Sequence, residues 1–166
     1  MKTILSLLAI SAALFAQAPG TGPLRRVNTY NATCTFSLSA AATAMTIQQP
    51  ASGAKTVRFI SSYIRSDAAI TLKQERNGTT ASATTATVRK QPEAATATAT
   101  AWCASNAGSG TPVIADDAVQ IPASSPQVLD LSSIQMKGDG IAVNFTIRIS
   151  TATANGAMVI TWEEWD

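Results

Sequence analysis

The sequence predicts an all-β protein: a single antiparallel β-sandwich or jelly roll of about eight or nine strands, preceded by a cleavable signal peptide. Three observations predict it. In several segments apolar residues recur at every second position, which is the period of a half-buried strand. Clusters of Gly, Asn and Pro separate these segments. Beyond the N-terminal region, no long segment has the 3.6-residue period of a helix.

The N-terminal segment, residues 1–18, has the features of a signal peptide. A short positive start precedes an unbroken run of apolar and small residues at 4–15, and a small-x-small pattern then places the cut after Ala16 or Ala18. The run is about 12 residues long, whereas crossing a bilayer takes about 20. We therefore expect export without membrane insertion after cleavage. Residues 19–27 are expected to form a flexible leader.

The rest of the chain, 28–166, is expected to form one sandwich domain, and its strands are predicted by strict alternation. The clearest segments are 30–38 and 141–149, in which five apolar residues share one face and polar residues share the other. Residues 158–162 alternate in the same way, with Trp162 on the inward face.

Further strands are predicted from shorter patterns. In residues 56–65 the apolar phase shifts at Phe59-Ile60, which indicates a bulge or a strand covered on both faces. Alternating Ala and Thr at 94–101 have the strand period, so we expect a strand there, with a low-complexity surface linker as the alternative. The remaining candidates are shorter runs at 45–49, 69–76, 80–88, 112–121 and 127–131.

Two Asn-Gly pairs predict tight hairpin turns. Asn77-Gly78 and Asn155-Gly156 each lie between predicted strands. Both residues tolerate the positive φ angles that a type I′ turn requires.

The two cysteines predict one disulfide. In an exported protein an even number of Cys indicates pairing, and two allow only Cys34–Cys103. The alternation puts Cys34 on the face of Phe36, and Cys103 on the face of the inward alanines of the Ala/Thr segment. Two buried free thiols are the alternative.

Three aromatic residues are candidates for contact with a ligand or partner. Trp102 is adjacent to inward-facing Cys103, so a regular strand points it outward, whereas a bulge or a covering loop buries it. Trp165 also points outward if Trp162 is inward, although a terminal Trp can instead fold over the end of the sheet. Tyr63 completes the set of aromatic side chains that could stack on a sugar.

Composition excludes several kinds of chemistry. The chain has no His, so Ser-His-Asp triads and imidazole metal ligands are ruled out. A formal net charge of +2 and 5 % aromatic residues give no platform for nucleic acid. The Asp residues lack the spacing of a calcium loop. We therefore expect no metal site, no cofactor and no catalytic residues.

The predicted function is a non-enzymatic structural, adhesive or assembly role at the cell surface or in the extracellular space, with the periplasm as another destination. A flexible leader and unpaired edge strands suit assembly with further copies or with other surface proteins. The alternative is a carbohydrate-binding module that recognises a polysaccharide through exposed Trp and Tyr. A weaker alternative is a small hydrolase that uses a pair of carboxylates.

Overall fold

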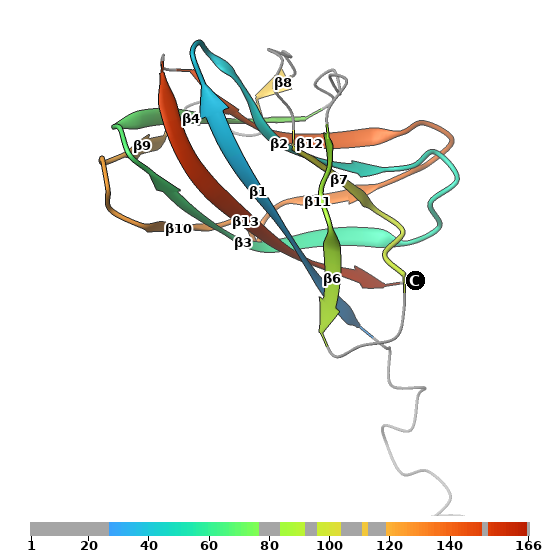
Figure 1. Cartoon of the computed structure of the whole chain (residues 1–166). Coiled ribbons are helices and arrows are strands. Elements are labelled where there is room, and N and C mark those ends of the chain that lie inside the picture. The colour runs from blue at the N-terminus through green and yellow to red at the C-terminus, as the bar shows by residue number, and fades with distance from the viewer. Residues whose placement is uncertain are drawn as a thin grey trace, which may run out of the picture.

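The computed structural model describes residues 27–76, 84–91, 96–103, 111–112, 119–150 and 153–165. Within these ranges the protein consists of strands and turns, arranged as two antiparallel sheets packed face to face (Figure 1). This confirms the predicted sandwich. No helix in the described ranges is long and apolar enough to cross a membrane. The predicted signal peptide and most of the predicted leader lie outside the described residues.

The first sheet has six strands in the order β10-β3-β13-β1-β6, and β11 also pairs with β3. It is built on three long strands that pair along most of their length. Its members are β1 (Asn28–Leu38), β3 (Thr56–Ser66), β6 (Val88–Gln91), β10 (Gln127–Asp130), β11 (Gln135–Lys137) and β13 (Ala154–Trp165).

The second sheet has seven strands in the order β5-β7-β2-β12-β4-β8, and β9 also pairs with β4. Its members are β2 (Ala42–Gln49), β4 (Ile70–Arg76), β5 (Thr84–Thr85), β7 (Thr100–Cys103), β8 (Thr111–Pro112), β9 (Val119–Ile121) and β12 (Val143–Ile149).

Eight of these strands have the order of a jelly roll. Strands β10-β3-β13-β1 form one layer and β9-β4-β12-β2 form the other. Along these eight strands the chain changes layer at every step except from β4 to β9. The other strands are short additions to the sheet edges. The prediction of eight or nine strands therefore corresponds to the jelly-roll core.

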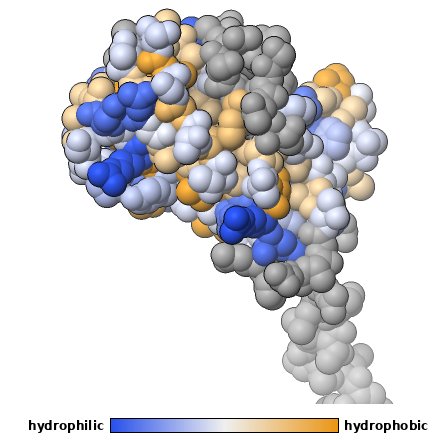
Figure 2. All heavy atoms as spheres, viewed as in Figure 1, coloured by the Kyte–Doolittle hydropathy of each residue, from blue (hydrophilic) through white to orange (hydrophobic). Residues whose placement is uncertain are grey.

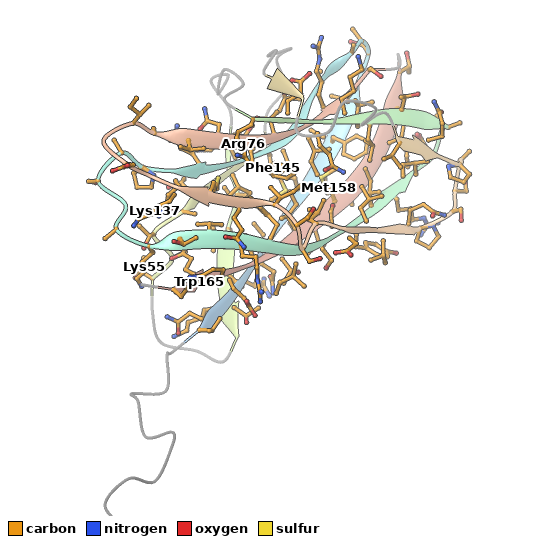
Figure 3. The ribbon with its side chains drawn as sticks, turned by 180° about the vertical axis from the view of Figure 1, so that it is seen from behind. Lys55, Arg76, Lys137, Phe145, Met158 and Trp165 are labelled. Atoms are coloured by element: carbon orange, nitrogen blue, oxygen red, sulfur yellow. A yellow bond between two sulfur atoms is a disulfide. The ribbon has the colours of Figure 1, made fainter. Side chains whose placement is uncertain are left out.

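The core lies between the two sheets and follows the predicted alternation. Phe59 from β3 and Phe145 from β12 meet across the two layers with ring centroids 4.4 Å apart. Tyr30 and Trp162 lie opposite each other on β1 and β13, with stacked rings 5.9 Å apart. Phe145 and Met158 both point into the space between the sheets (Figure 3). Burial of these large side chains supplies the main driving force for folding.

The hairpin predicted at Asn155-Gly156 is wrong. These residues lie inside β13, where Asn155 pairs with Ser37 and Gly156 pairs with Phe36. The preceding strand, β12, belongs to the seven-stranded sheet and β13 belongs to the six-stranded sheet, so no hairpin joins these two strands. Glycine is needed here for space, because a Cβ at Gly156 would lie 2.4 Å from Phe36 Cζ and 2.2 Å from the carbonyl oxygen of Arg65. The other predicted hairpin, at Asn77-Gly78, lies outside the described residues.

Two other predictions differ from the structure and one is confirmed. Ile141 is 75 % exposed and precedes β12, so the strand predicted to begin there begins at Val143. In the Ala/Thr segment, only Thr100 and Ala101 belong to a strand; 96–99 do not, and 94–95 lie outside the described residues. The phase shift in residues 56–65 is a bulge, because the register of β3 against β13 changes between Phe59 and Ser61.

Candidate functional site

The predicted disulfide joins the two sheets. Cys34 on β1 and Cys103 on β7 are bonded, with Cα atoms 5.4 Å apart. Strand β7 has only four residues and its sheet pairing is short, so the bond fixes a weakly held strand to the longest pair of strands in the molecule. Disulfides persist in oxidising compartments, so this one favours a location outside the cytoplasm.

Trp102 lies on the outer face of the seven-stranded sheet. It is opposite Thr46 in the pairing of β7 with β2, on the face away from Cys103, as a regular strand predicts. Its side chain is half-buried, and its indole nitrogen is buried with no hydrogen-bond partner in the described part of the chain. The next position across this sheet is Thr146, whose hydroxyl lies 3.2 Å from that of Thr46. Both threonines are fully buried.

Glu164 provides a second arrangement that the sequence prediction did not single out. Its carboxylate is fully buried and accepts hydrogen bonds from the N–H groups of Thr98, at 2.7 Å, and Ala99, at 2.9 Å. The indole N–H of Trp162 donates to the same carboxylate at 3.2 Å. Burial and the negative charge of Glu164 together raise the pKa of Tyr30. Glu164 therefore holds the segment before β7 against the end of β13.

The sequence pattern indicates that the Glu164 side chain is buried. The alternation that places Trp162 inward also places Glu164 inward, and a buried carboxylate requires donors. The two backbone donors come from residues that do not belong to a strand, and no local sequence pattern predicts them. Because the N–H groups of Thr98 and Ala99 donate to Glu164, residues 98–99 do not continue β7.

The outer face of the six-stranded sheet is the candidate interaction surface, and we call it the open face. It comprises the outward side chains of β10, β3, β13 and β1, which are half-buried or exposed in the described structure. Its middle row crosses four strands in register at Val128, Tyr63, Val159 and Thr33. Tyr63 is 43 % exposed and Val128 is 69 % exposed. Side by side, they place an apolar strip in the middle of a polar face.

Trp165 lies at one end of the open face. The guanidinium of Arg58 is 5.3 Å from the centre of the Trp165 ring and donates to Glu163 at 2.6 Å. In Figure 3, Trp165, Lys55 and Lys137 lie near the same end of the sandwich. At this end, Arg58 therefore lies against one face of the Trp165 ring.

The three predicted contact residues do not form one site. Trp102 lies on the outer face of one sheet, and Tyr63 and Trp165 lie on the outer face of the other. Tyr63 is seven positions along β3 from Thr56, the partner of Trp165, which corresponds to about 20 Å along the strand. A single small sugar therefore cannot stack on both rings.

A cavity of about 380 Å³ opens at the other end of the six-stranded sheet. Seven residues line it: Arg65, Ser66, Asp67, Ser124, Asn155, Gly156 and Ala157. Among the described residues that line it, one carries a carboxylate: Asp67, which accepts hydrogen bonds from the backbone and side-chain amides of Asn155 at 2.7 and 2.8 Å. These bonds lower the pKa of Asp67. Asn155 also accepts a bond of 2.6 Å from the Ser37 hydroxyl, so these polar groups hold strand ends together.

This cavity has little of what hydrolysis requires. Glycoside hydrolysis generally uses two carboxylates that face each other across the bond to be cleaved, and Asp67 is alone here. No group of three or more Cys, Asp or Glu side chains in the described residues could hold a metal ion.

Comparison with known proteins gives no relative, because no family model, curated protein or solved structure matches this chain.

Proposed function

We propose that this chain is an exported, non-enzymatic β-sandwich protein with a structural or assembly role at the cell surface or in the extracellular space, and that it acts through the open face. The observation that carries the proposal is the row of Val128, Tyr63 and Val159 across the middle of that face. An exposed apolar strip framed by polar residues is typical of a protein contact surface.

The composition of the open face also supports the proposal. Among the described residues, four large apolar side chains are exposed, and two of them, Tyr63 and Val128, are direct neighbours on this face. On the side of the molecule seen in Figure 2, polar and apolar residues are interspersed. Tyrosine is enriched at protein interfaces because it combines a large apolar area with one polar group.

Two features support export. Residues 1–18 have the charge, apolar run and small-x-small pattern of a signal peptide. The Cys34–Cys103 disulfide needs an oxidising compartment to persist.

The test is sedimentation velocity of the oxidised mature protein over a range of concentrations. We expect the wild type to shift towards a larger species as concentration rises, and the variant Tyr63→Lys/Val128→Lys to remain monomeric. Ile141→Lys is the control, because Ile141 is also a large apolar side chain and is more exposed than Tyr63 and Val128, but it lies outside the open face. Monomeric wild type at every concentration would contradict the proposal.

A polysaccharide is the second candidate for binding at the open face, because Tyr63 and Trp165 lie on it together. Their separation of about 20 Å requires an extended glycan. In a pull-down with insoluble polysaccharides, Tyr63→Ala and Trp165→Ala should lose retention, whereas Trp102→Ala, on the opposite face, should keep it. Equal retention of the wild type and all three variants would exclude this candidate.

A further inference from the structure

We infer that the partner of the open face is a second copy of this chain, related by a two-fold axis that runs across the strands along the Val128–Tyr63–Val159 row. This inference rests on the proposed assembly function and specifies how two copies are oriented relative to each other. It follows from how the charged residues are distributed above and below that row.

The open face is a grid whose rows are set by strand register. Relative to the middle row, the row on one side contains Arg65 on β3 and Ala157 on β13. The row on the other side contains Asp130 on β10 and Ser61 on β3. The apolar strip therefore has an exposed cation on one side and an exposed anion on the other, on neighbouring strands.

A two-fold axis along the middle row superposes that row on itself and exchanges the rows on either side. Tyr63 of one copy then lies over Tyr63 of the other, which buries apolar surface against apolar surface. The exchange also brings Arg65 over Ser61 of the partner copy, one strand away from the position of Asp130. Strands are about 4.8 Å apart, so a long guanidinium side chain can reach that carboxylate.

The symmetry produces this Arg65–Asp130 contact twice in each dimer. Glu163, on the same face, already accepts a bond from Arg58. Asp130 accepts a bond from the backbone N–H of Ser132, and its two oxygens have further acceptor capacity. Complementary charges beside an apolar strip fix the register of a contact and disfavour other arrangements.

The dimensions of the face suit such a contact. Strands β3 and β13 have 11 and 12 residues. At about 3.3 Å per residue and about 4.8 Å per strand, three or four strands present roughly 500 to 700 Å² per copy. Stable interfaces begin at about 600 Å² per partner. Aligned packing of two sheets is a common arrangement, and here the axis makes facing strands antiparallel.

The test is a charge-reversal cycle measured by sedimentation equilibrium at low and high salt. Arg65→Asp and Asp130→Arg should each weaken self-association on the order of tenfold, because each places two like-charge pairs in the dimer. The double variant Arg65→Asp/Asp130→Arg should recover wild-type association. Arg89→Asp is the matched control: it reverses an exposed charge on β6 beyond the strip and should leave association unchanged.

The outcomes separate the two proposals. If the wild type associates and Tyr63→Lys/Val128→Lys does not, but the double charge variant fails to recover association, the two-fold geometry is wrong and the assembly function stands. If the wild type is monomeric throughout, both are wrong. If the wild type is monomeric and a polysaccharide retains it but not Tyr63→Ala, the open face binds a glycan instead.

Discussion

Glu164 illustrates how one residue can organise a loop. Its carboxylate is fully buried and is held by three N–H donors rather than by an opposite charge. These hydrogen bonds offset the cost of burying a polar side chain. Since two of those donors are backbone groups of 98–99, the side chain determines where the segment before β7 lies.

Replacing Glu164 by Gln should destabilise the protein by about 2 to 3 kcal/mol, because a neutral amide directs its own N–H groups at the backbone donors. Urea unfolding of the oxidised protein measures this change. Glu163→Gln is the matched control, since its exposed pair with Arg58 should contribute at most about 1 kcal/mol. Equal effects of the two substitutions would contradict the role assigned to Glu164.

Asp67 should make the free energy of unfolding depend on pH. Hydrogen bonds from Asn155 lower its pKa in the folded state, so the ionised form stabilises the fold. This contribution is fully present above the unfolded pKa of about 3.9 and is lost as the pH falls through the lower folded value. The stability difference between the wild type and Asp67→Asn should therefore narrow as the pH falls below about 4. A difference that widens on acidification would contradict this sign.

At the scale of strands, the sequence predicts the elements whose period is regular. Segments 30–38 and 158–162 alternate strictly, and the strands observed there are longer than predicted. Asn155-Gly156 shows where local patterns fail. The sequence of this pair favours a turn, but Gly156 is needed inside β13 because Phe36 packs where a Cβ would be. That requirement comes from another strand and is invisible to a local pattern.

The candidate site was predictable only in part, for a similar reason. Alternation from Trp162 indicates that Trp165 points outward, and Tyr63 is a candidate because of its aromatic side chain. That Val128 lies beside Tyr63, and that Arg65 and Asp130 flank them, depends on the pairing of β10 with β3. Pairing between strands 65 residues apart is set by tertiary structure and cannot be read from either strand alone.

At the same scale, the disulfide should account for a large part of the stability. It closes a loop with a sequence separation of 69 residues. The chain-entropy relation gives about 4 kcal/mol for a loop of this length. Cys34→Ser/Cys103→Ser should therefore lower the free energy of unfolding by about that amount in urea titrations. Unfolding midpoints that agree for the oxidised protein and the double variant would contradict it.

For the whole molecule, the two outer faces differ in character. The seven-stranded sheet buries Thr43, Thr46 and Thr146 on its outer side, whereas the open face keeps its residues exposed or half-buried. An exposed sheet face of this kind is suited to face-to-face packing against the same face of a second copy. The apolar row and the flanking charges then define how two copies would meet.

Thiol cross-linking tests this arrangement most directly. Val159 lies on the proposed axis and so faces its own counterpart in the second copy, and the native cysteines are already bonded to each other. Val159→Cys, treated with a bifunctional thiol reagent spanning about 10 Å, the spacing of packed sheets, should form a covalent dimer. Gln120→Cys, exposed on β9 of the other sheet, should not. No covalent dimer from Val159→Cys, or equal yields from both variants, would contradict the proposed two-fold contact through the open face.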